Sequence, residues 1–244
     1  MLAQGEKAAL QFSGGKDSLA LLHLSRPHLD NITVFFGDTG STYPHVKQFV
    51  IDTCKELGAS LVMVEPFMPV QEFTEQYGFP SDLVSTDRAP EARWMNEEAE
   101  TKLQSYVSCC GNMIWLPMQA AIKARGIKII LRGSKGSDPH VTVPDGHKDE
   151  NFEYRSPLWG WTDKDVMRFL EDKDMPDQYP EIMDSMDCWI CTAHMTGKYA
   201  RQKLEYAREK YPTLWPEISR RVRIVRDAVS ADLSRVNHAF EVVT

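Results

Sequence analysis

Residues 13–18 read SGGKDS and lie between a short apolar segment and an amphipathic one. The backbone N–H groups at the start of a helix lack partners and carry partial positive charge, so they favour an anion. Adjacent glycines let a ligand approach the backbone closely, while hydroxyl groups and a lysine add donors. An ordinary turn would leave the lysine and both serines without a role. We therefore expect a phosphate chain to bind at Ser13, Gly14, Gly15, Lys16, Asp17 and Ser18, with Asp17 capping the helix or holding Mg²⁺.

A second group of polar residues follows the next apolar segment. Asp38, Thr39 and Gly40 stand directly after residues 32–37, which read ITVFFG. Open α/β sheets bind ligands at the carboxyl ends of their strands, where residues that follow neighbouring strands meet. We therefore expect these three residues to lie beside the first loop and to contact the same phosphate-bearing ligand.

The chain has five cysteines, an odd number that favours metal or redox chemistry over a set of disulfides. Cys109 and Cys110 are adjacent, and Cys188 and Cys191 form a C-x-x-C pair. Adjacent thiolates fit two corners of a large cluster better than two corners of one zinc tetrahedron. The spacing leaves open an iron–sulfur centre, a zinc ion or a redox dithiol. Cys54 differs, because it lies near the apolar face of a predicted helix and is expected to pack in the core.

The apolar pattern along the chain predicts an alternation of strands and helices. The fold class expected is α/β, a doubly wound and mostly parallel sheet of about five strands with helices on both faces, followed by a helical C-terminal segment. Residues 68–108 indicate a mostly helical excursion, and the C-terminal helices are expected to break at Pro212 and Pro216. The domains expected are residues 1–195, which contain the excursion, and residues 196–244, a basic extension packed on them. Strands are predicted over 8–12, 32–38, 60–66, 127–133 and 152–159, and helices over 16–25, 44–58, 115–126 and 162–173.

Composition and charge restrict the classes of function. The chain has 244 residues and a net charge of −7, which excludes a surface that binds nucleic acid all over. Residues 198–226 nevertheless hold nine Lys or Arg and three Glu. This basic segment is either a solvated helical face or a nucleic-acid surface, with Arg220, Arg221 and Arg223 as the expected phosphate contacts. The sequence has no stretch of about 18 apolar residues, so a cytoplasmic protein is expected.

The loop SGGKDS resembles the pyrophosphatase loop S-G-G-x-D-S of the adenine nucleotide α-hydrolase superfamily, the PP-loop enzymes that split ATP into AMP and pyrophosphate. The segments DTGSTYPHV and RSPLWGWTDKDVMRFL resemble the PAPS reductase branch of that superfamily, and the resemblance extends over residues 8–195. It implies ATP and Mg²⁺ as ligands, with Lys16, Asp17 and Ser18 as catalytic residues.

The same resemblance implies roles for residues elsewhere in the chain. Arg132 and Lys135, in LRGSKGSD, stand at a strand end where the basic residues of the family face the nucleotide. The cluster-containing sulfonucleotide reductases pair a Cys-Cys dipeptide with a distant C-x-x-C. Their pattern implies a [4Fe–4S] cluster here on Cys109, Cys110, Cys188 and Cys191.

The chain differs from those reductases in the cysteines of its C-terminal residues. They carry a nucleophilic cysteine in a C-terminal tail, whereas residues 192–244 contain none. A PP-loop with a cluster but without that thiol resembles the ATP pyrophosphatases of DNA phosphorothioation, the DndC and SspD type. This resemblance implies adenylation of a target for sulfur incorporation, with a cysteine desulfurase as partner and DNA, more than tRNA, as the nucleic acid. The alternatives are an APS or PAPS reductase, a tRNA-thiolation enzyme and an inert nucleotide-binding Fe–S scaffold.

Overall fold

The computed structural model describes residues 2–3, 5–84, 101–138, 143–179 and 181–243. The chain divides into two compact units, each built from several chain segments. The first unit comprises Met1–Asp38, Thr42–Pro66 and Ile114–Asp187; the second comprises Thr39–Ser41, Phe67–Met113 and Cys188–Thr244. No helix in the described ranges is both long and apolar enough to span a membrane.

The first unit is built around a five-stranded sheet whose paired strands all run parallel. The strand order is β3-β2-β1-β6-β7, which places the first strand in the centre. Leu10 of β1 is in register with Val34 on one side and with Leu131 on the other. The α/β fold class and the five strands are therefore confirmed. The strands are β1(Ala8–Gln11), β2(Ile32–Gly37), β3(Ser60–Val64), β6(Ile129–Leu131) and β7(Glu153–Arg155).

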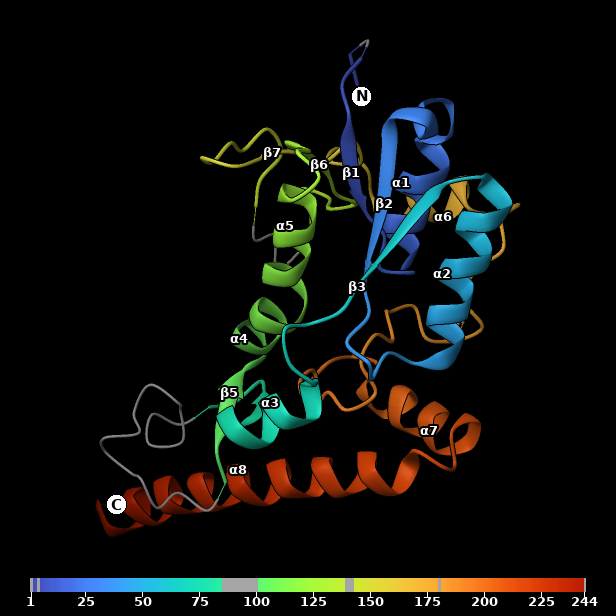
Figure 1. The fold of residues 1–244 in the computed structure, drawn as a ribbon. Coiled ribbons are helices and arrows are strands. Elements are labelled where there is room, and N and C mark those ends of the chain that lie inside the picture. Colours follow the sequence, from blue (N-terminus) through green and yellow to red (C-terminus); the bar gives the residue numbers. More distant parts are fainter. Residues whose placement is uncertain (1, 4, 85–100, 139–142, 180, 244) are drawn as a thin grey trace. The chain divides into compact units, whose positions relative to one another are not determined.

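Helices cover both faces of this sheet, as Figure 1 shows. Side chains alternate between the faces of a strand, so Ala8 and Leu10 enter one core and Ala9 enters the other. The first core also contains side chains of α1, α2 and α6, and the second contains side chains of α5. The helices are α1(Lys16–Leu24), α2(Pro44–Leu57), α5(Leu116–Lys123) and α6(Asp163–Phe169), with a 3₁₀ helix η1(Arg26–Asn31).

Cys54 confirms its predicted place in the core of the first unit. Its side chain is 1% exposed and packs with Val50 and Val34. Burial raises the pKa of Cys54 to about 11, because the thiolate would lose its hydration. The thiol is therefore protonated at neutral pH and acts as a small apolar side chain.

The second unit combines helices with a small parallel sheet that the sequence did not predict. Residues 68–108 were expected to be mostly helical, but β4 and β5 pair within them. Gly78 makes this pairing possible, since a Cβ there would lie 2.9 Å from the carbonyl carbon of Lys102. Part of the predicted helical excursion, residues 85–100, lies outside the described ranges. The elements are α3(Val70–Tyr77), β4(Phe79–Ser81), β5(Leu103–Ser105), α4(Tyr106–Cys110), α7(Ala200–Lys210) and α8(Trp215–Val243), with a π-helical turn η4(Gly111–Trp115) between the units.

The C-terminal helices are confirmed, with one correction to their break. Pro212 lies between α7 and α8, as expected. Pro216 lies in the first turn of α8, where a missing N–H costs nothing, so it begins a helix and does not interrupt one. Val225 and Ala228 of α8 pack on Leu103 of β5. The C-terminal helices thus share a unit with part of the 68–108 segment, and the two units do not follow the predicted boundary at residue 195.

Arg221 corrects the prediction of a phosphate contact on the basic segment. Its side chain is 1% exposed, and its guanidinium donates to Glu217 Oε1 at 2.7 Å and to Thr74 Oγ1 at 3.0 Å. The guanidinium also lies 5.3 Å from the ring centroid of Phe79. A buried cation with these partners ties α8 to α3 and β4 and cannot meet a phosphate backbone. Arg220 also donates to Glu217, whereas Arg223 is exposed.

We expect Glu217→Gln to destabilise the fold by roughly 1–3 kcal/mol at pH 7, because buried Arg221 loses its charged partner. Hydrogen bonds from Arg220, together with Arg221, lower the pKa of Glu217 from 4.5 to about 2. A folded-state pKa below the unfolded value means that the ionised carboxylate stabilises the fold above pH 4.5, and that this contribution is lost as the pH falls toward 2. Urea unfolding at pH 7 and at pH 3 measures both effects.

Glu205→Gln is the matched control, since Glu205 pairs on the surface with Arg201. Its effect should stay within about 0.5 kcal/mol at either pH. Equal destabilisation by the two variants, or a Glu217→Gln effect that does not shrink at pH 3, would contradict the buried-pair explanation.

Candidate functional site

The loop that follows β1 is a backbone cradle that ends in the N-terminus of α1. Gly14 has a φ of 83°, and a Cβ there would lie 3.0 Å from Val46 Cγ1, so only glycine fits. Gly15 is the N-cap of α1, and no side chain caps the helix. A Cβ on Gly15 would meet only Ser13 Oγ at 3.4 Å and Ser185 Cβ at 3.8 Å. The absence of a side chain at Gly15 therefore leaves the cradle open, as the binding of an anion requires.

The two serines of the loop define its shape. Ser13 Oγ and Ser18 Oγ lie 3.1 Å apart, and Ser18 Oγ donates to the Gly15 carbonyl at 3.0 Å. Ser13 Oγ in turn accepts from the Gly15 N–H at 3.3 Å. Each hydroxyl can reorient toward a ligand oxygen, because a hydroxyl both donates and accepts.

Two lysines and three aspartates form an ion-pair network beside the cradle. Lys16 Nζ lies 3.0 Å from Asp17 Oδ2 and 2.7 Å from Asp163 Oδ1. Lys135 Nζ lies 2.8 Å from Asp17 Oδ1, 2.8 Å from Asp138 Oδ1 and 3.4 Å from Asp163 Oδ1. Asp17 therefore pairs with both lysines and does not cap α1, which corrects one of the two roles predicted for it.

Lys135 is the most buried cation of the network, with a side chain 2% exposed. Burial alone would lower the pKa of Lys135, but the hydrogen bonds that its ammonium group donates to Asp138 and Asp17, together with their negative charges, raise that pKa above its ordinary value. The ammonium group is thus charged throughout the physiological range. A fixed positive charge at this point can stabilise a phosphate anion.

Gly133 brings Lys135 to the cradle, and the sequence motifs did not single it out. A Cβ at Gly133 would lie 2.8 Å from the carbonyl carbon of Asp17 and 2.8 Å from the N atom of Ser18. Because both are backbone atoms of the first turn of α1, they cannot move aside cheaply. The loop after β6 can therefore approach α1 only with glycine at this position.

We expect Gly133→Ala to separate the loop after β6 from α1 and to weaken the affinity for pyrophosphate at least about tenfold, because overlap with backbone forces a shift. Isothermal titration with pyrophosphate and thermal unfolding measure the two consequences. Gly160→Ala is the control, since a Cβ there meets no atom within 4 Å. Unchanged affinity in Gly133→Ala would show that Lys135 is not part of the anion site.

The cradle and the lysines line one pocket of about 290 Å³. Tyr179 and the residues near 184 were missed by sequence reasoning, because no motif marks the segment that follows α6. The Lys16 N–H donates to Tyr179 Oη at 3.5 Å, so this phenol lies over the N-terminus of α1. Burial raises the pKa of Tyr179, so the hydroxyl stays protonated. The lining residues are Ser13, Gly15, Lys16, Asp17, Ser18, Lys135, Asp138, Asp163, Tyr179, Met183, Asp184 and Ser185.

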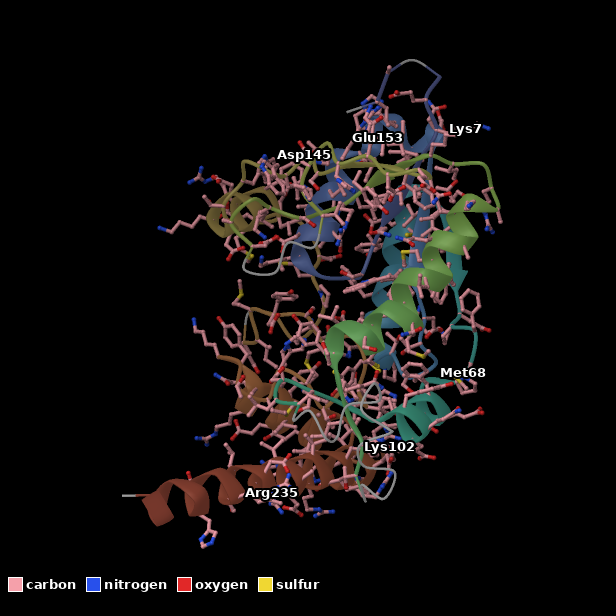
Figure 2. All side chains as sticks on the ribbon, turned by 90° about the vertical axis from the view of Figure 1, so that its left-hand side faces the viewer. Lys7, Met68, Lys102, Asp145, Glu153 and Arg235 are labelled. Carbon is pink, nitrogen blue, oxygen red and sulfur yellow. The ribbon has the colours of Figure 1, made fainter. Side chains whose placement is uncertain are left out.

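Five of the predicted nucleotide contacts are not among these lining residues: Gly14, Asp38, Thr39, Gly40 and Arg132. Asp38 is 6% exposed and accepts from Lys47 Nζ at 2.5 Å. The Arg132 N–H donates to the Arg155 carbonyl, and burial lowers the pKa of Arg132. Thr39 and Gly40 belong to the second unit. Figure 2 labels Lys7 and Glu153, which lie at the amino ends of β1 and β7. The cradle lies at the opposite, carboxyl end of β1.

The four cysteines predicted as ligands all belong to the second unit. Burial, followed by the neighbouring Cys110 and Cys188 thiols, raises the pKa of Cys109 to about 12. Burial and the other three thiols also raise the pKa of Cys191. The thiols thus lie close enough to affect one another, and none forms a disulfide. Among the residues that the structure describes, no group of three or more His, Cys, Asp or Glu side chains is arranged to hold a metal ion.

The turn that carries the C-x-x-C pair is fixed by hydrogen bonds at several points. The Cys191 N–H donates to the Cys188 carbonyl at 3.1 Å, and Thr39 Oγ1 donates to Cys188 Sγ at 3.7 Å. His194 follows with a φ of 62°, which is uncommon for a residue with a side chain. Asp82 supports this conformation by accepting from the His194 N–H at 2.7 Å. Thr39, predicted as a nucleotide contact, therefore lies against a cysteine.

Residues 7–194 match the phosphoadenosine phosphosulfate reductase domain family. The parallel sheet and the family match place the chain in the adenine nucleotide α-hydrolase-like class, which is a superfamily of enzymes. Within this class, the chain belongs to the phosphoadenosine phosphosulfate reductase domain family.

One solved structure agrees with this assignment at the level of the fold, and two further proteins are similar to this chain. The PAPS reductase of Candida auris, solved as a phosphate complex, superposes with a TM-score of 0.52 at 16% identity, covering 76% of this chain and 83% of that one. An FMN adenylyltransferase of Candida glabrata in complex with ATP has a TM-score of 0.39 at 18% identity, with 68% and 46% covered. An uncharacterized protein of Methanocaldococcus jannaschii is 22% identical over 228 residues, which are 89% of this chain. The chain spans about half the length of that relative, 49%.

Proposed function

We propose that this protein is an ATP pyrophosphatase, which cleaves ATP to AMP and pyrophosphate and adenylates a target for sulfur incorporation. The observation that carries the proposal is the pocket at the N-terminus of α1, where an open glycine cradle meets Lys16 and Lys135. An acceptor oxygen attacks the α-phosphorus, the bond from that phosphorus to the bridging oxygen breaks, and pyrophosphate leaves with the electron pair. The chain's own task is to bind and stabilise this leaving group.

Each lining group has a role in that step. The N–H groups of Gly15 and Lys16 would donate to the departing phosphates in place of Ser13 Oγ and Tyr179 Oη, and the lysine ammonium groups would neutralise the charge that grows on those phosphates. The protonated Tyr179 hydroxyl can donate to a phosphate oxygen that replaces it at the Lys16 N–H. Asp17 fits Mg²⁺, a hard cation that prefers carboxylate oxygens and would screen the phosphate charge when bound. These roles use only groups that line the pocket.

Product analysis tests this proposal directly. Incubation with ATP, Mg²⁺ and candidate acceptors should release pyrophosphate in an amount equal to the sum of free AMP and AMP bound to the acceptor. Release of ADP and phosphate would refute it. Stoichiometric ATP binding without turnover, even with nucleic acid and partner proteins present, would instead favour the inert Fe–S scaffold.

We further propose that Cys109, Cys110, Cys188 and Cys191 hold a [4Fe–4S] cluster. The donor set supports this, since burial and then the neighbouring thiols raise the pKa of Cys109 and of Cys191, and a cation among the four thiols would act in the opposite direction. Thiolate sulfur is the ligand that iron–sulfur clusters use. The cluster would position the turn that contains Cys188, and no thiol beyond these four and buried Cys54 is available to carry sulfur. Sulfur would then come from a cysteine desulfurase partner.

DNA is the acceptor that we propose for the adenylyl group, in the manner of DNA phosphorothioation. A second pocket, of about 310 Å³, supports a nucleic-acid surface on α7 and the start of α8. Trp215 offers it an aromatic face, and Arg201 and Arg208 are 86% and 56% exposed along the same helix face. Binding to single-stranded DNA should weaken steeply with salt, because phosphate contacts release counterions.

The identity of the substrate is tested in the host. Its DNA is digested with nuclease and analysed by mass spectrometry for phosphorothioate dinucleotides, with and without the gene. If loss of the gene changes the amount of thiolated tRNA and leaves the DNA unchanged, the acceptor of the adenylyl group is RNA.

A sulfonucleotide reductase is the second candidate, favoured by the family match over residues 7–194. That reaction needs a nucleophilic thiol, and in this candidate function a second protein chain supplies that thiol. Release of sulfite from APS or PAPS with thioredoxin would establish this activity. Failure with a full set of reductants would exclude it.

A further inference from the structure

The pocket at α1 contains an anion of its own in the position where a ligand phosphate would meet the lysines. Asp163 Oδ1 lies 2.7 Å from Lys16 Nζ and 3.4 Å from Lys135 Nζ, so a single oxygen bridges both ammonium groups. Lys16 and Asp163 are 147 residues apart in the chain. A carboxylate oxygen and a phosphate oxygen are equivalent acceptors for an ammonium group, so the two compete for the same donors.

Asp163 differs from the other carboxylates of the network in how it is held. Asp17 belongs to the first turn of α1, and Asp138 also accepts from the Lys135 backbone N–H at 2.8 Å. Asp163 has a side chain that is 71% exposed, whereas those of Asp17 and Asp138 are 29% and 32% exposed. The Asp163 carboxylate can therefore rotate into solvent at small cost.

The backbone at Asp163 is fixed without its side chain. The adjacent Thr162 and Asp165 form a capping box, in which Thr162 Oγ1 accepts from the Asp165 N–H and Asp165 accepts from the Thr162 N–H. Replacing Asp163 by asparagine keeps the shape of the side chain and leaves this cap intact. The substitution thus isolates the charge of Asp163 from the fold of α6.

We propose that Asp163 is an internal competitor of the ligand phosphates, which pairs with Lys16 and Lys135 in the ligand-free protein and sets the affinity of the pocket for pyrophosphate and ATP. The pocket is lined by four aspartates and two lysines, so each phosphate must enter against an excess of negative charge. Asp17 and Asp163 both bridge the two lysines, and Asp163 is the more exposed of the two, so its removal makes part of the lysine charge available to the ligand. The inference rests on the proposed function in that it takes this pocket as the phosphate site.

The test compares pyrophosphate binding by the full chain, measured by titration calorimetry at low ionic strength, in wild type, Asp163→Asn and Asp172→Asn. We expect Asp163→Asn to bind pyrophosphate roughly three- to tenfold more tightly, with an advantage that shrinks as salt is added. Asp172→Asn removes the same charge from an exposed pair with Lys173 and should leave affinity unchanged. Asp163→Ser serves if the asparagine variant does not fold.

Unchanged or weaker binding by Asp163→Asn would overturn the inference and would assign Asp163 to holding the ligand. An equal gain in Asp172→Asn would also overturn it, because general charge would then explain the effect. Absence of binding by all variants at millimolar pyrophosphate would overturn it too. Product analysis of the wild type decides the proposed function separately, since a tighter Asp163→Asn complex with no AMP formed would refute the reaction and keep the competitor.

Discussion

Replacing Lys16 by methionine should lower the rate of pyrophosphate release by roughly 10²- to 10³-fold, the usual cost of removing one group that stabilises developing charge. Methionine keeps most of the apolar stem and removes only the ammonium group, which lies at the end of the cradle beside Lys135. The charge on the leaving pyrophosphate is larger in the transition state than in bound ATP. The loss should therefore fall mainly on kcat, with a smaller change in KM.

Lys173→Met is the matched control, because Lys173 pairs with exposed Asp172 and does not line the pocket. Thermal unfolding of both variants separates a chemical effect from a loss of fold. A Lys16→Met rate within about twofold of wild type would contradict the assigned role, since the removal of a transition-state contact costs far more. A rise in KM alone, with kcat unchanged, would assign Lys16 to ground-state binding.

The second large effect concerns metal content. We expect protein prepared anaerobically to be brown and to contain iron and acid-labile sulfide, and Cys188→Ser with Cys191→Ser to lose nearly all of both. The physical reason is that the two serine hydroxyls cannot replace thiolates as ligands of iron. Loss of the metal should also change how fast the cysteine thiols are alkylated. Without a cation, burial and neighbouring thiols keep the pKa of Cys109 near 12, so the group is protonated at pH 7 and should alkylate slowly.

Cys54→Ala controls for the loss of a buried thiol from the first unit and should leave iron and sulfide unchanged. Single substitutions of Cys109 and Cys110 then show whether each of the adjacent thiols is a ligand. One zinc per chain with no acid-labile sulfide would replace the cluster by a zinc site. A folded wild-type protein that binds neither metal when reconstituted would reject the four cysteines as ligands.

Sequence alone determined the parts of this protein whose causes are local. Apolar strands alternate with capped or glycine-ended helices over short distances, and this pattern predicted the parallel sheet and the helices on both its faces. The cradle at residues 13–18 was equally visible, because Gly14 and Gly15 lie between a strand and a helix that their neighbours specify. Burial of Cys54 followed from its place on one helix.

Tertiary structure decided which distant residues complete the site. Tyr179 reaches the Lys16 N–H across 163 residues, and Asp163 reaches its ammonium group across 147. No spacing in the sequence encodes these contacts, because they depend on how the loops after separate strands return to one edge of the sheet. The approach of Gly133 to α1, which brings Lys135 into the pocket, has the same origin.

Tertiary structure also decided which charged side chains are buried and which partners they have, neither of which a count of charges in the sequence reveals. Arg221 belongs to a basic segment and reads as a surface cation, yet it is 1% exposed against Thr74 and Phe79. Asp17 stands where a cap is expected, yet it pairs with Lys16 and Lys135. A charged side chain takes the environment that its partners create. Besides Glu217 on its own helix, the partners of Arg221 include Thr74 of α3 and Phe79 of β4, more than 100 residues earlier in the chain.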